Sequence, residues 1–414
     1  MRGIIFVVAG SLSIQANEPR WEDPAGWPLH VIDASSRGAD GTRLEDVNGD
    51  GRLDVATGWE EGGVTRVYLQ PEPAQVREPW PQVTVGRTAS VEDAVLADLD
   101  GDGPWDVVSC SEGKARVVQV HWAPEAAEDF LKAGAWRQAA FPVEVLPSQM
   151  WMFAAPGQID GQHGVDFFVG SKGGPGRAVV GWMQAPEPGR VRDLAAWCWH
   201  PLRPASWVMG LEARDMDGDG DLDAVVSERF HGERGGCFWL ENPSSMDAPW
   251  VEHAIGVMGK DALFFCQADI DQDGLLDVCV GTQTAKGTQG TEGLYWLRRL
   301  DASGQRWEER RVEIGVPVGE FKAVSAGDID LDGRMDLVLD FNYASAEKPA
   351  VIWLQQRGDP MQPDWRALPL SGPKGGVKTD LCPLLDLDGD GDLDVMTCEE
   401  KKNLGVIWYE NPAR

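Results

Sequence analysis

The sequence is poor in histidine, tyrosine and basic residues. It contains 6 histidines, 4 tyrosines and 37 lysines and arginines, against 67 aspartates and glutamates, so its formal charge is −30 at pH 7. Nucleic acid is bound by proteins with a basic footprint, because its phosphates must be neutralised. The composition therefore argues against nucleic acid as a partner and disfavours docking on an anionic membrane surface.

Short catalytic motifs are also missing: the chain has no G-x-S-x-G, HExxH or P-loop sequence. It has no Asn-x-Ser/Thr acceptor for glycosylation, and none of its seven cysteines has CxxC spacing. Cys110, Cys279 and Cys398 lie in apolar runs and are interpreted as small buried side chains. Cys382 and Cys398 flank one acidic segment, and the sequence leaves open whether they form a disulfide across a hairpin.

Long hydrophobic runs are absent, and one short run lies at the N-terminus. In "MRGIIFVVAGSLSIQA" (1–16), Arg2 precedes the apolar run and Ala16 ends it. The run is too short to cross a bilayer, and the pattern is typical of a secretory signal peptide. We therefore expect cleavage after Ala16, no membrane insertion, and a mature chain of 17–414 that is secreted, periplasmic or on the cell surface. The alternative is a buried or irregular N-terminal tail.

What the sequence has in abundance is a repeated aspartate-rich segment. Successive copies begin 52, 60, 57, 54, 59 and 58 residues apart, which gives seven units of about 57 residues. Six copies are near-perfect, and "QIDGQHGVD" (158–166) is a degenerate one. The six intact copies are "DVNGDGRLD" (46–54), "DLDGDGPWD" (98–106), "DMDGDGDLD" (215–223), "DIDQDGLLD" (269–277), "DIDLDGRMD" (328–336) and "DLDGDGDLD" (386–394).

Each copy is embedded in β-rich surroundings. An apolar run precedes the acidic segment, and another such as "LDVATG" follows it. A run with Trp or Tyr and a fourth short segment complete the unit. Four-stranded units repeated around an axis predict an all-β, seven-bladed β-propeller with antiparallel blades. The last unit lacks its fourth strand, so we expect a strand near residues 27–34 to complete it and close the ring.

The spacing D-x-[DN]-x-D-G-x-x-D predicts a metal-binding loop in each intact unit. It supplies side-chain oxygens at positions 1, 3, 5 and 9 and a backbone carbonyl at position 7, and the glycine at position 6 permits a sharp turn. A set of hard oxygen ligands without Cys or His favours Ca²⁺ over Zn²⁺ or Cu²⁺. The predicted ligands are Asp46, Asn48, Asp50, Arg52, Asp54, Asp98, Asp100, Asp102, Pro104, Asp106, Asp215, Asp217, Asp219, Asp221, Asp223, Asp269, Asp271, Asp273, Leu275, Asp277, Asp328, Asp330, Asp332, Arg334, Asp336, Asp386, Asp388, Asp390, Asp392 and Asp394.

The degenerate copy serves as an internal comparison. Gln158, Gln162 and His163 replace two aspartates and the turn glycine, so we expect no tight metal site there and about six Ca²⁺ in all. At about 1 mM Ca²⁺ and a Kd near 0.1 mM, each site would add about 1.4 kcal/mol of stability. Six sites would add about 8 kcal/mol, comparable with the net stability of a whole domain. The expected role of calcium is therefore structural.

With these loops, the unit length and the closure, the chain resembles the FG-GAP/VCBS repeat family, whose propellers are similar to the integrin α-subunit head. The resemblance covers about residues 27–414 and implies the calcium-ligand roles above. The Phe-Gly and Gly-Ala-Pro signatures are mostly absent, with "AAPG" (154–157) a partial match. The family includes adhesion proteins, lectins and some polysaccharide lyases, so the resemblance does not decide the activity.

If the strands meander, the acidic loops share one face and the remaining inner connections share the other. The loops of that second face carry acidic, basic and aromatic residues, which would suit a sugar or an anionic polymer, although loops are also polar simply because they are solvated. A tryptophan recurs once per unit in the third strand and is interpreted as packing between blades: Trp122, Trp182, Trp239, Trp296, Trp353 and Trp408. The candidate ligand-binding residues are Glu60, Glu112, Lys172, Arg229, His231, Lys260, Lys322, Lys378 and Glu399.

Two functions remain open on sequence grounds. The first is an exported calcium propeller that binds a glycan or an extracellular or periplasmic protein, without catalysis. The second is a polysaccharide-active enzyme, a lyase or hydrolase, with its site on the face opposite the calcium loops. The absence of a local catalytic motif favours the first, but a carboxylate pair assembled only by the fold would leave no such motif.

Overall fold

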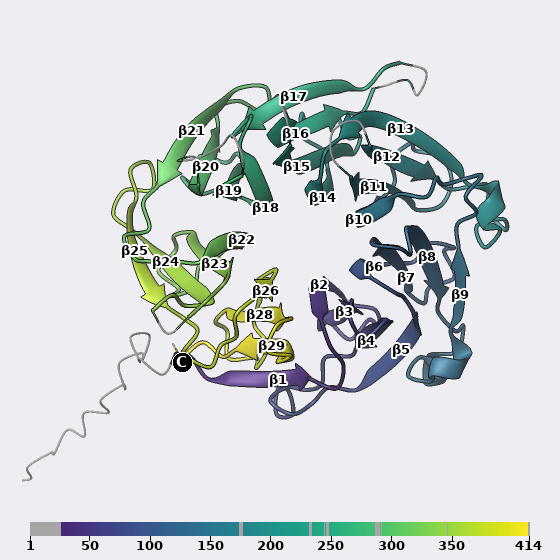
Figure 1. The fold of residues 1–414 in the computed structure, drawn as a ribbon, viewed down its shortest axis with the longest axis horizontal. Coiled ribbons are helices and arrows are strands. Elements are labelled where there is room, and N and C mark those ends of the chain that lie inside the picture. The colour runs from purple at the N-terminus through teal and green to yellow at the C-terminus, as the bar shows by residue number, and fades with distance from the viewer. Residues whose placement is uncertain are drawn as a thin grey trace, which may run out of the picture.

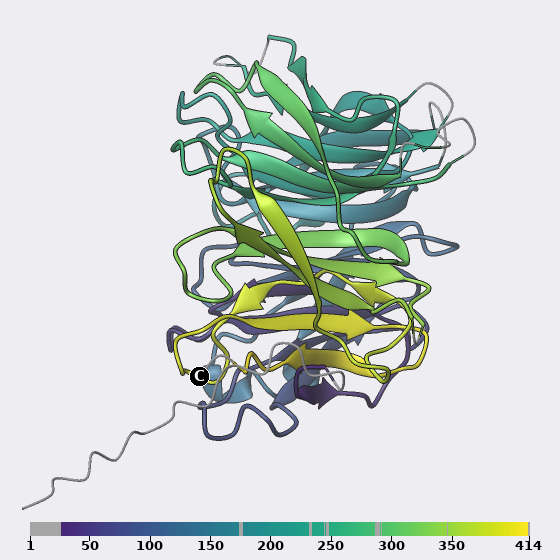
Figure 2. The ribbon, with the colours of Figure 1, turned by 90° about the vertical axis from the view of Figure 1, so that its left-hand side faces the viewer.

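The computed structural model describes residues 26–412, apart from 174–176, 232–233, 244, 246–247, 286–289, 291 and 346. The expected signal peptide (1–16) lies outside these residues. The described chain forms seven antiparallel β-sheets arranged around a central axis (Figure 1). In the side view the strands run between two faces and the connections turn at either face (Figure 2). The fold is the expected seven-bladed β-propeller.

Blades 1 to 3 each contain four strands that follow one another along the chain, from the innermost strand to the outermost. Their bounds are β2 (Ala39–Glu45), β3 (Asp54–Trp59), β4 (Val64–Tyr68) and β5 (Gln82–Arg87); β6 (Val91–Ala97), β7 (Asp106–Ser111), β8 (Val117–Trp122) and β9 (Arg137–Ala140); and β10 (Met150–Gly157), β11 (Asp166–Lys172), β12 (Ala178–Gln184) and β13 (Cys198–Ala205).

Blades 4 to 6 repeat the arrangement. They comprise β14 (Val208–Arg214), β15 (Asp223–His231), β16 (Arg234–Glu241) and β17 (Val251–Gly256); β18 (Asp261–Ala268), β19 (Asp277–Gln283), β20 (Gly293–Arg299) and β21 (Trp307–Val312); and β22 (Glu320–Gly327), β23 (Asp336–Asn342), β24 (Val351–Arg357) and β25 (Asp364–Pro369). The helices among the described residues are short 3-10 turns: η1 (Ala127–Asp129), η2 (Ala133–Ala135) and η3 (Leu194–Ala196). None of the described helices is long and apolar enough to span a bilayer.

Blade 7 combines both ends of the described chain. Its inner strand is split into β26 (Thr379–Asp380) and β27 (Leu384–Leu385), followed by β28 (Asp394–Glu399) and β29 (Gly405–Tyr409). The outer position is taken by β1 (Leu29–Asp33), which pairs antiparallel with β29 so that His30 faces Trp408. The expected closure by residues near 27–34 is therefore confirmed, and it covers what would be an exposed sheet edge.

The burial pattern explains why the strand sequences differ from inside to outside. In β3, every residue of DVATGW is buried, because both faces of a middle strand pack against neighbouring blades. In β21, the sequence WEERRV is mostly exposed or half-buried, because this strand lies at the rim. All six repeated tryptophans of the third strands are buried, as expected for packing between blades.

Candidate metal centres and the opposite face

Each acidic loop joins the innermost strand of a blade to the second strand, so the seven loops share one face. The first aspartate is held by the backbone of its own loop. In blade 1, Asp46 accepts hydrogen bonds from the N–H groups of Gly49 (2.8 Å), Asp50 (3.1 Å) and Gly51 (2.8 Å). The position-6 glycine adopts a positive φ, +85° at Gly51, which suits a residue without Cβ. The loop geometry thus turns the carboxylates inward.

Carboxylate oxygens converge in these loops. In four of them, three aspartates place oxygens within 4.8 Å of one another: Asp98, Asp100 and Asp106; Asp215, Asp217 and Asp223; Asp269, Asp271 and Asp273; and Asp328, Asp330 and Asp332. Like charges at such distances repel by about 1 kcal/mol even in bulk water, and by more near a protein surface. An oxygen-only donor set of this kind fits Ca²⁺.

Several of these oxygens are buried and lack a hydrogen-bond partner. They belong to Asp98, Asp271, Asp330 and Asp392, and both carboxylate oxygens of Asp392 are affected. A buried carboxylate oxygen without a partner is costly unless a cation neutralises it. No buried oxygen of the degenerate loop 158–166 is unsatisfied in this way. The carboxylates of these four loops therefore fit a divalent cation. The intact loops 46–54 and 215–223 have no such oxygen either, so this feature alone does not separate the intact loops from the degenerate one.

The degenerate loop satisfies itself with amides. Gln158 accepts the N–H of Gly161 (3.0 Å), and Gln184 donates its side-chain amide to Asp160 (2.5 Å). The positive φ falls on Gly164 instead of His163. The neutral amides of Gln158 and Gln162 stand at the two loop positions where the intact copies have aspartates.

The ninth position has a role that the sequence reasoning did not separate from metal binding. In all seven loops its carboxylate is buried, and each oxygen accepts at least one backbone N–H. In blade 7, Asp394 accepts from Leu387 (2.9 Å) and Asn411 (2.8 Å). Burial raises the pKa of these carboxyls above the ordinary value. The values are about 6 for Asp54 and Asp166, about 7 for Asp223, Asp277 and Asp336, and about 8 for Asp106 and Asp394.

Side chains from the third strands and from neighbouring connections also reach the loops, and the sequence analysis missed them. Arg298 contacts Asp271 and Asp273, and Gln355 donates to Asp330 (2.6 Å). Both lie two residues after the repeated tryptophan of their blade, as Gln184 does. This offset from Trp296, Trp353 and Trp182 is the signal that would have identified them. Two other arginines lie outside that pattern: Arg192 pairs with Asp100 and Asp102, and Arg77 with Asp388.

On the opposite face, charged side chains from blades 1, 2, 3, 6 and 7 gather where the innermost strands begin. We call them the central charged cluster. Lys322 donates to Asp380 at 2.9 Å, Lys172 pairs with Glu112 and Lys378 with Glu400. The cluster comprises Asp40, Glu60, Glu92, Glu112, Lys172, Lys322, Lys378, Asp380 and Glu400, and the carboxylate oxygens of Asp40, Glu60 and Glu92 lie within 4.8 Å of one another.

Burial and neighbouring charges shift the pKa values of the members of this cluster in different directions. Burial, reinforced by Asp380 and Glu92, raises the pKa of Asp40 well above its usual value. Burial also acts on Asp380, but Lys322 and the other partners outweigh it and lower its pKa. Burial lowers the pKa of Lys172. The cluster thus contains two buried carboxyls whose pKa values shift in opposite directions, and a partly desolvated amine.

Five of the nine predicted ligand-binding residues meet in this cluster: Glu60, Glu112, Lys172, Lys322 and Lys378. The others do not. Arg229 forms a two-pronged pair with Asp261 at 3.0 and 2.7 Å, and Lys260 pairs with Glu309 at 2.5 Å.

Of the remaining two predicted residues, Glu399 does not join the cluster. The carboxylate of Glu399 is buried and accepts backbone N–H groups of its turn, including that of Lys402 at 2.8 Å, so Glu399 holds the turn rather than facing solvent. His231 ends β15, and its side chain lies outside the described residues.

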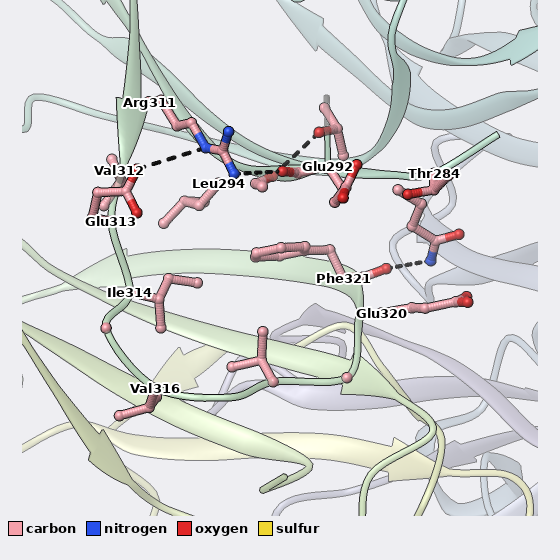
Figure 3. A pocket seen from close by; sticks show the side chains of 16 residues that line it. Thr284, Glu292, Leu294, Arg311, Val312, Glu313, Ile314, Val316, Glu320 and Phe321 are labelled. Atoms are coloured by element: carbon pink, nitrogen blue, oxygen red, sulfur yellow. Dashed lines mark hydrogen bonds and ion pairs between the residues drawn. The ribbon is translucent and has the colours of Figure 1, made fainter. Parts of the chain in front are cut away.

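The same face has a side pocket of about 360 Å³ between blades 5 and 6 (Figure 3). Its floor is apolar and includes Leu294, Val312 and Phe321, and its rim carries Glu313 and Arg311. Arg311 donates to the backbone carbonyl of Glu292 at 3.0 Å. Pockets of this size accommodate small ligands or single side chains. The sequence does not predict this pocket, because its wall is the irregular connection 313–319.

All seven cysteines are free thiols in this structure, Cys382 and Cys398 included. The sulfur of Cys382 lies 3.6 Å from the hydroxyl of Ser325, and the sulfur of Cys398 lies 3.3 Å from the backbone carbonyl of Asp380. The disulfide left open by the sequence is therefore not formed between these two residues here.

Together, the fold and the acidic loops define a seven-bladed β-propeller with repeated aspartate-rich hairpins. The model of the FG-GAP-like repeat matches residues 46–109 and 269–339. The chain is thus a seven-bladed propeller in which these two segments are FG-GAP-like repeats, and this type of propeller supports an interaction module. No curated protein matches its sequence.

Among solved structures, one matching chain comes from the "Crystal Structure of Mitotic Checkpoint Complex". It is 11% identical with a TM-score of 0.51, and the match covers 98% of this chain and 99% of that chain. At this identity the likeness concerns the propeller fold alone.

Proposed function

We propose that this protein is an exported, calcium-stabilised propeller that binds a glycan or a protein partner through the face opposite its acidic loops. The observation that carries the calcium part is the convergence of carboxylate oxygens in the acidic loops, with buried, unpartnered oxygens in four of the six intact ones. Export is supported by the signal-like pattern of residues 1–16. Binding on the opposite face is supported by the central charged cluster, where acidic and basic groups lie within reach of a polar ligand.

Calcium removal tests the first part. A chelator should lower the melting temperature of the full chain by 10 °C or more, because six sites would contribute about 8 kcal/mol. Added Ca²⁺ should restore it, and Mg²⁺ at the same concentration should restore it less. The measurement is a thermal unfolding scan at several Ca²⁺ concentrations. A melting temperature that does not respond to chelation would refute the structural role of calcium.

Binding is tested with arrays of polysaccharides and exported proteins in the presence of Ca²⁺. A ligand that binds the wild type should bind Lys172→Gln at least tenfold more weakly, because the amine lies within the central charged cluster. Lys132→Gln is the matched control, since Lys132 lies on blade 2 away from that cluster and pairs with Asp129. Equal losses in both variants would contradict a site at the cluster.

A polysaccharide-active enzyme remains the second candidate. The observation in its favour is the buried pair of Asp40 and Asp380, whose pKa values shift in opposite directions, since paired carboxyls with separated pKa values can share acid and base roles. The same arrays, assayed for new reducing or unsaturated ends, distinguish the two functions. Turnover that is lost in Asp380→Asn would establish the enzyme, and binding without turnover would support the interaction module.

A further inference from the structure

The first hairpin of blade 5 places two cysteines opposite each other. Cys266 in β18 and Cys279 in β19 are direct partners in the antiparallel register. Facing residues in such a pair project to the same side, with Cα atoms about 4.5–5.5 Å apart. Native disulfides span about 4.4–6.8 Å between Cα atoms. The neighbouring Cys266 side chain is also the first cause of the raised pKa of the Cys279 thiol, as expected for two adjacent thiols. The backbone is therefore already placed for a cross-strand disulfide.

This arrangement is not shared by the other cysteines in the described strands. Cys110 faces Asp93 and Val118, Cys237 faces Ser227 and Gly256, Cys198 faces Gln184, and Cys398 faces Asp380 and Val406. Cys382 lies between β26 and β27 and outside a named strand. Cys266 and Cys279 flank an acidic segment in the sequence, as Cys382 and Cys398 do, but whether two such cysteines face each other across the hairpin depends on register.

We propose that Cys266 and Cys279 form a disulfide when the folded protein meets a disulfide oxidant, and that this bond clamps the two strands flanking the acidic loop 269–277. Cys266 is only half-buried, so a small oxidant can reach it, whereas Cys279 is buried. The Cys266 sulfur attacks one sulfur of the oxidant and releases the first thiol. Cys279 then attacks the Cys266 sulfur and releases the second. Two electrons pass to the oxidant, and the two cysteine protons end on the released thiols.

The position of the bond gives it a structural consequence. The acidic loop begins three residues after Cys266 and ends two residues before Cys279. A crosslink there restricts the unfolded hairpin and so favours the closed loop. The proposal relies on the exported location proposed above only for the source of the oxidant in the cell. The purified protein tests it independently of that location, of calcium and of any ligand.

The experiment exposes the folded full chain in Ca²⁺ to oxidised glutathione, removes the oxidant and counts thiols after denaturation. Apart from a glutathione adduct on the exposed Cys198, which peptide mapping identifies, the wild type should fall from seven thiols to five. Its melting temperature should rise by about 5 °C. Cleavage at aspartates separates the two cysteines, because Asp269 to Asp277 lie between them. The two peptides should then stay joined until reduced. Cys266→Ser should keep six thiols, and Cys279→Ala should keep five with glutathione held on Cys266, whereas Cys398→Ser should fall from six to four.

Two results would overturn the proposal. One is a wild type that retains seven thiols, or that carries a stable glutathione adduct on Cys266 while Cys279 stays free. The other is a loss of two thiols that peptide mapping assigns to a different pair, such as Cys382 and Cys398. A failure of the calcium or ligand-binding tests described above would leave these readouts unchanged, so the two sets of results are distinguishable.

Discussion

At the scale of single residues, the aspartates of the acidic loops divide into two groups. Those near the start of the loop converge on a space that a cation would fill. The ninth also holds backbone N–H groups at two places, as Asp394 does with Leu387 and Asn411, even where it joins the convergent set, as Asp106 and Asp223 do. The spacing of the motif predicts that oxygens converge, but not this division. The degenerate loop reveals it, because Asp166 keeps the same backbone contacts, with Ile159 and Ala185, in a loop that has lost two other aspartates.

A buried histidine gives a pH-dependent prediction at this scale. His121 is fully buried, its Nε2 lies 2.9 Å from the hydroxyl of Ser109, and burial lowers its pKa to about 4. The unfolded chain has a His pKa near 6.5. Below that value the unfolded state binds a proton that the folded state does not, so stability falls as the pH falls. This group alone should cost about 2 kcal/mol between pH 7 and pH 5.

The variant His121→Gln checks this prediction by chemical denaturation at both pH values. Glutamine does not titrate, so the loss of unfolding free energy between pH 7 and pH 5 should be smaller than in the wild type by about 2 kcal/mol. His163→Gln is a suitable control, because His163 lies exposed in the degenerate loop. An identical pH dependence in wild type and His121→Gln would mean that His121 is protonated inside the fold.

At the scale of elements, the degenerate hairpin differs from a metal-binding one at three positions of the motif. The degenerate loop keeps the strands on both sides, β10 and β11, and keeps Asp160 and Asp166. Restoring the missing residues with Gln158→Asp, Gln162→Asp and His163→Gly should therefore add one calcium site. Equilibrium dialysis with metal analysis should give one more Ca²⁺ per chain than the wild type.

The matched control for this restoration carries Gln158→Asn, Gln162→Asn and His163→Gly. It has the same turn glycine and similar side-chain sizes, but it lacks the two added charges. Its calcium count should equal that of the wild type. If the aspartate version also shows no increase in bound calcium, the hydrogen bond that the Gln184 side-chain amide donates to Asp160 (2.5 Å) prevents the loop from opening to an ion.

The closing strand β1 gives a second prediction at this scale. It buries Ile32, and Trp27 just before it is buried and donates its backbone N–H to Leu370 at 2.9 Å. Deletion of residues 1–34 should cost about 3–6 kcal/mol from these two apolar side chains alone. It should also leave the edge of β29 exposed to other chains. Denaturation and light scattering should show lower stability and association. Deletion of residues 1–25 is the control and should change neither.

At the scale of the whole molecule, the repeat made the architecture predictable. Seven units of similar length fixed the number of blades, and the missing last strand located the closure. The central charged cluster could be predicted only in part, because its members come from five blades and meet through the ring. Lys172 and Glu112 were expected on this face, for example, but nothing in the sequence shows that they touch. The register that places Cys266 opposite Cys279 is likewise set by the pairing of the folded strands, and the sequence does not show it.

The net charge of −30 gives a prediction for the molecule as a whole. Six Ca²⁺, carrying +12, would bring the formal charge to −18. Without them, repulsion among the loop carboxylates should dominate, and salt should relieve it, because the screening length falls from about 30 Å at 0.01 M to about 3 Å at 1 M. The melting temperature of the chelated protein should therefore rise with KCl by several degrees more than that of the calcium-loaded protein. Equal salt dependence would mean that the loops carry little mutual repulsion.

The pairing of β1 with β29 also sets an order of events during synthesis. His30 and Glu410 are joined by a 2.8 Å contact although 380 positions separate them in the chain. The ribosome makes β1 first, yet the strand that receives it emerges only after the other six blades. Until then β1 has no partner strand within its own propeller. The growing chain must therefore keep this segment away from other exposed edges until translation reaches the final blade.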